Sequence, residues 1–184
     1  MAVRPVLLYP DPRLKQVCVP VEPNSLDIAR VVEDLLDTMN AGPPRTVGIA
    51  APQIGEMVRI ALVDTSRNPK YPGGSGFLAL VNPVIVAHSE EQFFREGCLS
   101  LPDYTANIRR WRHITVRATD PDGNELTVQA SDFEAVVLQH EIDHLDGILF
   151  LDRVANAKTD LFQRGSEARA RQDRNKPRQS VESS

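Results

Sequence analysis

The residues best suited to chemistry are two histidines and a glutamate in the segment 140–144, which reads His-Glu-Ile-Asp-His. On an α-helix, positions four residues apart lie on the same face, so the imidazoles of His140 and His144 can share one metal ion. Glu141 follows the first histidine, where its carboxylate can reach a water molecule at that ion. The spacing therefore predicts a metal site with a carboxylate base, which is an arrangement used for hydrolysis.

Two histidines leave this site incomplete, because catalytic metal sites usually have three protein ligands and an open position for water. Downstream, the candidate third ligands are the carboxylates of Asp152, Asp160 and Glu167. Upstream, Cys98 in the segment 96–100, Glu-Gly-Cys-Leu-Ser, is a further candidate. A lone cysteine is by default a small buried apolar residue. The residues alone leave the choice of third ligand open.

A third segment, 48–55, reads Gly-Ile-Ala-Ala-Pro-Gln-Ile-Gly and consists mostly of small residues. Such a sequence lets the backbone come close to another group. Gln53 carries the only side chain in the segment that can donate a hydrogen bond. The segment is therefore either a tightly packed turn between a helix and a strand or the support for one donor at a site.

Two helices are predicted by apolar residues at a spacing of three and four. The first spans 25–39, and its apolar face is formed by Ile28, Val31, Val32, Leu35, Leu36 and Met39. The second begins near Ser131 and carries both histidines. Glu134 lies three residues after Ser131, which is the capping-box spacing. A short third helix is expected over 159–171.

Strands are predicted between the two helices. The ranges 58–64, 77–81, 84–87, 113–119 and 125–130 have strand-like composition, and Asp-Pro-Asp-Gly at 120–123 predicts a hairpin. The Pro- and Gly-rich range 67–76 is expected to be a long loop. Strands in the middle of the chain with helices on either side indicate an α+β domain. The polar range 173–184 is expected to be disordered.

Composition limits the class of protein. The chain has 184 residues, 41% of them hydrophobic, and a formal net charge of −4, which is typical of one globular domain and gives no reason to expect DNA binding. Apolar runs are too short for a signal peptide or a bilayer span, so we expect no membrane partner. Cys18 and Cys98 are the only cysteines, which suits a reducing compartment such as the cytoplasm.

Taken together and in this order, the segments 48–55, 96–100 and 139–145 resemble the motifs of the peptide deformylase family. The last segment reads Gln-His-Glu-Ile-Asp-His-Leu. The resemblance implies an α+β fold in which small antiparallel sheets pack around a central metal-binding helix, with a further helix near the N-terminus. We expect a peptide deformylase-like catalytic domain over 1–164, followed by a polar, flexible tail over 165–184, because the end of the chain has few apolar residues. The implied activity is metal-dependent removal of the formyl group from N-formylmethionyl ends of newly made polypeptides.

The resemblance also assigns roles to residues. Glu141 would carry the proton, while the side-chain amide of Gln53 and the backbone N–H of Leu99 would meet the negative formyl oxygen. The native metal is often Fe²⁺ in this family, and Zn²⁺, Ni²⁺ or Co²⁺ can occupy the site. The implied metal ligands are Cys98, His140 and His144.

The substrate is expected to be an N-formylmethionyl peptide or a nascent chain, bound by an apolar slot and by main-chain hydrogen bonds. Phe133, Val136 and Val137 precede His140 on the same helix and can contribute to that slot. By similarity to the family, Val47 and Phe94 join them. The peptide is expected to pair in extended form with the chain near Gly48 and Gly97.

Some positions depart from the family or have two interpretations. Thr46 replaces a glycine of the first motif, and Thr105 stands where some members carry arginine. Glu96 and Arg110 match a pair that we interpret as structural. Asp143 is expected on the helix surface, and the alternative is an acceptor that orients a ligand imidazole.

Two other functions compete with deformylation. One is a peptidase that uses Glu167 as third metal ligand. The other is an inactive relative that binds nascent chains or the ribosome through the segment 164–184, which contains six Lys/Arg and three Asp/Glu. The presence of Gln53, Cys98 and Glu141 together with both histidines argues against an inactive protein.

Overall fold

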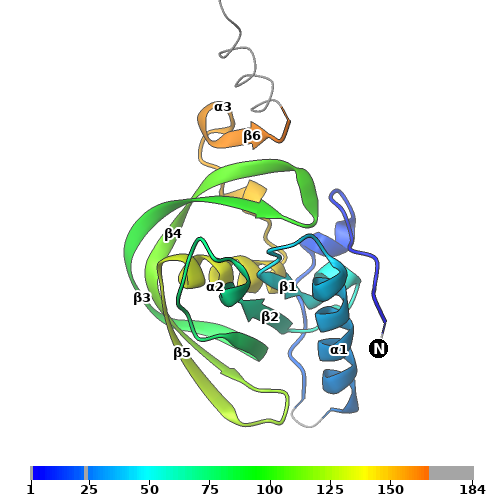
Figure 1. The fold of residues 1–184 in the computed structure, drawn as a ribbon. Helices are drawn as coiled ribbons and strands as arrows, with labels where there is room; N and C mark the ends of the chain where they lie inside the picture. The colour runs from blue at the N-terminus through cyan, green and yellow to red at the C-terminus, as the bar shows by residue number, and fades with distance from the viewer. Residues whose placement is uncertain (1, 23–24, 166–184) are drawn as a thin grey trace, which may run out of the picture.

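Two long antiparallel strands dominate the structure, a computed structural model that describes residues 2–22 and 25–165. Strand β3 spans Phe77–Cys98, and β4 spans Leu101–Thr119. Cys98 pairs with Leu101, so the hairpin between the strands turns directly after the cysteine. Figure 1 shows both strands curving around helix α2 (Asp132–Leu145). The histidine helix therefore lies inside the bend of the hairpin.

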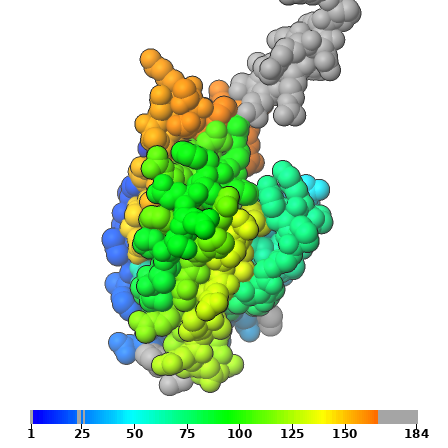
Figure 2. All heavy atoms as spheres, turned by 90° about the vertical axis from the view of Figure 1, so that its left-hand side faces the viewer, coloured from blue at the N-terminus to red at the C-terminus, as the bar shows by residue number. Residues whose placement is uncertain are grey.

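The sheet follows the order of the chain. Strands β1 (Gly48–Ala50), β2 (Ile60–Asp64), β3, β4 and β5 (Glu125–Ser131) are antiparallel neighbours in that order, and β6 (Leu161–Gln163) pairs with β4 outside this path. Figure 2 shows the green and yellow-green atoms of β3, β4 and β5 covering one side of the molecule. The expected α+β fold is confirmed, and the long strands join the expected small sheets into one.

The two strands predicted at 77–81 and 84–87 are parts of β3. Between them, Asn82 has a φ of 51° and the register to β4 shifts. The Asn82 side chain bonds the backbone N–H and C=O of Val21 at 2.9 and 2.8 Å. Asn-Pro therefore produces a β-bulge, which bends a strand without ending it. Strand β4 likewise begins twelve residues before the predicted 113, since it starts at Leu101.

Helix α1 (Leu26–Ala41) forms where the apolar spacing predicted it. The Ser25 hydroxyl accepts from the backbone N–H of Asp27 and caps the helix. Its buried residues pack on the residues of β1 and β2. This cluster contains Ile28, Val31, Leu35, Met39, Ile49, Ile60 and Leu62. The 48–55 segment contains β1 and leads toward β2. Its buried side chains pack in this cluster, so helix α1 supports the segment.

The predicted capping box of α2 is wrong. The Ser131 side chain makes no cap hydrogen bond. Glu134 is buried, and its carboxylate accepts instead from the backbone N–H of Ser75 at 2.6 Å and from the Ser75 hydroxyl. This glutamate therefore holds the 67–76 loop against the start of the helix.

An N-terminal arm holds the segments together. The backbone N–H of Leu7 donates to the carbonyl of Gln53 at 2.7 Å, and that of Tyr9 donates to the carbonyl of Ser100 at 2.9 Å. Further along, Cys18 N–H donates to the carbonyl of Leu145, the last residue of α2. This N-terminal segment, which includes a 3₁₀ helix over Pro12–Lys15, thus contacts all three motif regions.

The C-terminal part differs from the prediction. Helix α3 covers only Ala157–Asp160 and is followed by β6, so the helix predicted over 159–171 is wrong at 161–163. Residues 166–171 and the predicted disorder of 173–184 lie outside the described residues. The domain boundary at 164/165 stays a prediction. Across residues 2–22 and 25–165, no helix has the length and apolar character needed to cross a bilayer.

Candidate metal centre

Three side chains from two elements meet at the predicted metal site. Cys98 ends β3, while His140 and His144 lie one turn apart on α2. One ligand atom from each lies within 4.8 Å of the others, and the Cys98 Sγ is 3.2 Å from the His144 Nε2. Cys98 and His144 are buried, and the His140 side chain is 11% exposed. The i, i+4 spacing therefore places both imidazoles beside the sulfur.

The other candidate ligands do not join this cluster. Asp152 accepts from the backbone N–H of Leu149 at 2.7 Å and pairs with Lys15. Asp160 accepts from the backbone of Asn156. Glu167 lies outside the described residues. Of the candidates that the structure describes, only Cys98 lies beside the two histidines.

The two cysteines are both buried, but their surroundings differ. Burial raises the pKa of the Cys18 thiol to about 11. Burial acts in the same direction on Cys98, but the adjacent imidazoles, His144 first, hold the pKa of its thiol well below the usual value. A thiolate is the form of cysteine that binds metals. The neighbours of Cys98 therefore favour the ligand form.

Glu141 lies in the same pocket with an unsatisfied carboxylate. It is buried, and burial raises its pKa to about 7. Its Oε2 and the His144 Nδ1 are the buried side-chain atoms without a hydrogen-bond partner among the described residues. A Cβ on Gly48 would overlap the Glu141 Oε1, so the absence of a side chain at that position makes room for the carboxylate.

Gln53 points its amide toward the cysteine. Its Oε1 accepts from the backbone N–H of Ala50 at 2.9 Å, which fixes the amide orientation. Its Nε2 donates to the Ser100 hydroxyl at 3.1 Å and lies 3.5 Å from the Cys98 Sγ. The segment is thus a packed turn, a short 3₁₀ helix over Ala51–Ile54, that also carries a donor to the site.

A cavity of about 540 Å³ opens beside these groups. Every residue expected to contact substrate lines it. These are Val47, Gly48, Phe94, Gly97, Phe133, Val136 and Val137, together with Gln53, Leu99 and Glu141. Cys98 and His140 lie in the same wall, whereas His144 does not line the cavity and lies behind them.

Sequence reasoning missed Tyr71, which belongs to the 67–76 loop. Its ring stacks on that of Phe133 at 4.2 Å between centroids and lies 5.5 Å from that of Phe94. Both phenylalanines line the cavity. Tyr71 therefore supports the apolar wall from outside, and no periodicity in the loop could have indicated it.

A buried ionic network lies behind His140. Its Nδ1 is 2.8 Å from the Glu96 carboxylate, which also accepts from the Arg110 guanidinium at 2.6 and 2.9 Å. Burial alone would raise the pKa of Glu96. Hydrogen bonds from Arg110 and then from His140 outweigh burial and lower this pKa to about 2. An ionised carboxylate only accepts, so the Nδ1 carries a proton and the Nε2 is the nitrogen that would bind a metal.

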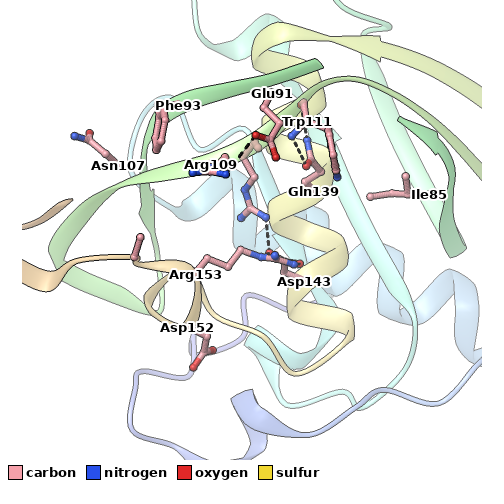
Figure 3. Close-up of a pocket in the computed structure, with 12 residues that line it drawn as sticks. Ile85, Glu91, Phe93, Asn107, Arg109, Trp111, Gln139, Asp143, Asp152 and Arg153 are labelled. Atoms are coloured by element: carbon pink, nitrogen blue, oxygen red, sulfur yellow. Dashed lines mark hydrogen bonds and ion pairs between the residues drawn. The ribbon is translucent and has the colours of Figure 1, made fainter. Parts of the chain in front are cut away.

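The network continues to Asp143, whose expected place on the helix surface is wrong. Asp143 is buried, and its Oδ2 accepts from Arg110 at 2.6 Å. Arg153 donates one hydrogen bond of 2.5 Å to each of the two carboxylate oxygens. Figure 3 shows Arg153 reaching Asp143 on α2. Asp143 orients no imidazole directly, since Glu96 holds that position. Glu96–Arg110 is paired as expected and also contacts a metal ligand.

The departures at the rim have local explanations. Thr46 does not take a positive φ; the neighbouring Arg45 does, at 73°. The Thr46 hydroxyl donates to the carbonyl of Pro43 at 2.7 Å. Thr105 accepts through its hydroxyl from the Arg95 Nε at 3.1 Å. Thr46 lines the cavity, whereas Thr105 does not.

The donor set fits a divalent transition metal. A thiolate and two imidazoles are ligands that Zn²⁺ and Fe²⁺ accept in proteins. The His140 tautomer fixed by Glu96 offers its second nitrogen toward the sulfur side. The residues present are therefore suited to hold one divalent ion.

Comparison with known proteins identifies the family of the chain. The family model described as polypeptide deformylase matches residues 3–160. The chain belongs to the polypeptide deformylase family. It is therefore a deformylase, a metal-dependent hydrolase that removes the formyl group from new peptides.

Relatives of this deformylase come from several bacteria. A peptide deformylase of Rhizobium meliloti is 42% identical over 164 residues, covering 88% of this chain and 90% of the relative. One of Heliobacterium modesticaldum is 43% identical, covering 85% and 97%. The crystal structure of a peptide deformylase from Legionella pneumophila has a TM-score of 0.76 at 35% identity, covering 96% of this chain and 100% of that one.

Proposed function

We propose that this deformylase acts on the N-formylmethionyl ends of newly made polypeptides at the centre formed by Cys98, His140 and His144. The convergence of these three side chains beside the Glu141 carboxylate, in the wall of an apolar cavity, carries the proposal. A peptide deformylase of Acinetobacter baumannii has been solved with Met-Ala-Ser bound, and it is similar to this chain with a TM-score of 0.75 at 34% identity, covering 83% of this chain and 99% of that one. A deformylated peptide that begins with methionine is thus a ligand of a close structural relative.

Cys98, His140 and His144 would hold the metal, which we propose to be Fe²⁺ in the cell, with Zn²⁺, Ni²⁺ or Co²⁺ able to replace it. When bound, a divalent ion supplies Lewis acidity that lowers the pKa of water toward neutrality. The chain contributes the geometry: Glu96 fixes the tautomer of His140, and burial keeps bulk water away from the thiolate. A thiolate ligand also makes the site sensitive to oxidation.

The reaction converts a formamide and water into formate and a free amine. Glu141 would take a proton from the attacking water and give it to the leaving amine nitrogen. Its raised pKa of about 7 supports this role, because such a carboxyl group both accepts and releases a proton near neutral pH. The Gln53 side-chain amide and the Leu99 backbone N–H would donate to the formyl oxygen as it becomes negative, and one such donor typically contributes ~2.7–4 kcal/mol.

The apolar part of the cavity would hold the methionine side chain. Phe133, Val136 and Val137 form one side from α2, while Phe94 and Val47 approach from β3 and the end of the 42–47 turn. The peptide backbone would extend between Gly48 and Gly97, neither of which has a side chain of its own. Main-chain pairing tolerates many sequences, which suits an enzyme that acts on many polypeptides.

Formate release tests the activity directly. The protein is purified without oxygen, loaded with Fe²⁺, and given formyl-Met-Ala-Ser beside acetyl-Met-Ala-Ser. We expect formate from the formyl peptide and no cleavage of the acetyl peptide, whose extra methyl group enlarges the acyl group. Equal turnover of both peptides, or of neither, would contradict the proposal.

Metal content separates this proposal from a peptidase that uses Glu167. Cys98→Ala is expected to lose most of its metal, while Glu167→Ala keeps it. The opposite pattern would favour the peptidase. Both variants are compared by metal analysis after the same loading and dialysis.

We also propose that the protein works in the cytoplasm and contacts the ribosome transiently through its C-terminal segment. The excess of Lys/Arg over Asp/Glu in 164–184 supports this contact, since ribosomal RNA attracts positive charge. Removing residues 166–184 is expected to weaken cosedimentation with ribosomes at low salt. Unchanged ribosome affinity would refute the contact.

A further inference from the structure

Arg164 lies at the mouth of the cavity, although it is far from every motif in the sequence. Strand β6 pairs with β4 so that Phe162 is opposite Thr105 and Gln163 is opposite Tyr104. The next residue, Arg164, donates its backbone N–H to the carbonyl of Asp103 at 2.7 Å. Figure 1 shows β6 beside the end of the β3–β4 hairpin. This pairing brings the Arg164 side chain to the rim.

The Arg95 side chain anchors this segment. Its guanidinium lies 3.5 Å from the centroid of the Phe162 ring, a cation–π contact, and its Nε donates to the Thr105 hydroxyl. Arg95 and Phe162 thus hold β6 to the edge of the cavity. The position of Arg164 is therefore defined by the pairing of β6 with β4 and by the contact between Phe162 and Arg95.

The Arg164 guanidinium occupies the space that a side chain at position 97 would need. A Cβ on Gly97 would overlap the Arg164 Nη2. The φ of Gly97 is not positive, so the backbone conformation does not require a glycine there, and the end of the Arg164 side chain lies in the space beside it. The guanidinium consequently lies directly over the backbone that we propose to pair with the peptide.

The Arg164 guanidinium is also available to a ligand. It is exposed, and within the described part of the chain no carboxylate or carbonyl accepts from it. The carboxylates in the cavity wall belong to Glu96, which is paired with Arg110, and to Glu141 at the metal centre. A guanidinium has five N–H donors in a fixed fork, which suits carbonyl oxygens on a main chain.

We propose that Arg164 binds the main-chain carbonyl oxygens of the substrate beyond its first residue and so makes the enzyme favour extended peptides. This inference rests on the proposed function. A substrate that places its formyl group at Glu141 and its backbone along Gly97 must leave the cavity past Arg164. The arginine is thus a specificity-determining residue that contacts substrate away from the reacting atoms.

Two formylated substrates of different length test this contact. Formylmethionine methylamide ends before the rim, and formyl-Met-Ala-Ser amide extends past it; the amide removes the terminal carboxylate as a competing ligand. Arg164→Ala is expected to lower kcat/KM for the long substrate by about tenfold, mainly through KM, because a charged donor is lost. The short substrate should change less than twofold. Arg164→Lys should recover part of the loss, since it keeps the charge without the fork.

Arg109→Ala is the matched control, because Arg109 is an exposed arginine of β4 that faces away from this cavity and pairs with Glu91. It should leave both substrates unaffected. An equal loss on both substrates for Arg164→Ala, or no loss on either, would overturn the inference while leaving deformylation intact. No formate from either substrate with the unaltered enzyme would instead refute the proposed function, on which the inference rests.

Discussion

The two sides of His140 differ in how their polar groups are satisfied. Behind the ring, Glu96, Arg110, Asp143 and Arg153 form a continuous set of ion pairs with contacts of 2.5 to 2.9 Å. In front of it, the Oε2 of Glu141 has no partner among the described residues, although it is buried. One side therefore has its charges paired, and the other keeps a buried carboxylate unpaired.

The paired charges behind His140 position that ring, whereas the unpaired Glu141 carboxylate in front of it is suited to react. A buried charge without a partner is costly, and such groups gather where chemistry is done. A buried ion pair that is fully hydrogen-bonded holds its side chains in position. Removing one member leaves the other charge buried without a partner, which is destabilising. We therefore expect changes behind His140 to affect folding stability first, and changes in front of it to affect activity first.

The largest effect on stability is expected from Arg110→Met. It leaves Glu96 and Asp143 without their shared guanidinium, which should lower the free energy of unfolding by ~3–5 kcal/mol. Arg109→Met, one position earlier and exposed, should cost less than ~1 kcal/mol. Urea unfolding of both variants provides the comparison. Similar costs for the two would show that the network does not stabilise the fold.

In front of the ring, Gly48→Ala is expected to act mainly on activity. The added methyl group would overlap the Glu141 Oε1 and displace the carboxylate, and a shift of this kind costs roughly 100-fold in rate. The free energy of unfolding should fall by only ~1–3 kcal/mol from overpacking. Steady-state formate release and urea unfolding measure the two effects. Activity within threefold of the parent would mean that Glu141 does not need its present position.

A smaller effect is expected where Tyr71 supports the apolar wall. Tyr71→Ala removes the ring that stacks on Phe133, and an aromatic pair contributes ~0.5–1.5 kcal/mol. We expect KM for formylmethionyl substrates to rise several-fold with kcat little changed. Tyr71→Phe keeps the ring and should behave like the parent. An equal rise in KM for both variants would indicate that the hydroxyl, and not stacking, matters.

The sequence predicted the parts of the site that depend on local spacing. Two histidines four residues apart on an apolar helix must share a face, so His140, His144 and Glu141 followed from periodicity. Cys98 as third ligand needed the family resemblance, because spacing alone cannot bring two distant segments together. Its place at the end of β3 beside α2 agrees with that expectation.

What the sequence did not predict depends on the path of the chain in space. Tyr71 lies in an irregular loop that Glu134 holds through Ser75, a contact that the capping-box interpretation assigned elsewhere. The helix sequence places Asp143 at the surface, because nothing in that sequence indicates that β4 and Arg153 pack against this side of α2. Asn82-Pro83 likewise predicts a break between two strands, and only the pairing with β4 shows that the strand continues through a bulge.

Glu141→Gln tests the central claim most directly, with metal content, urea unfolding and formate release measured on the same preparation. The amide is nearly the same size and is less costly to bury than an unpartnered carboxylate. We predict unchanged metal content, a free energy of unfolding no lower than that of the parent, and formate release reduced by ~10²–10⁴-fold. Formate release within threefold of the parent would contradict the account, because Glu141 would then not be the group that moves the proton.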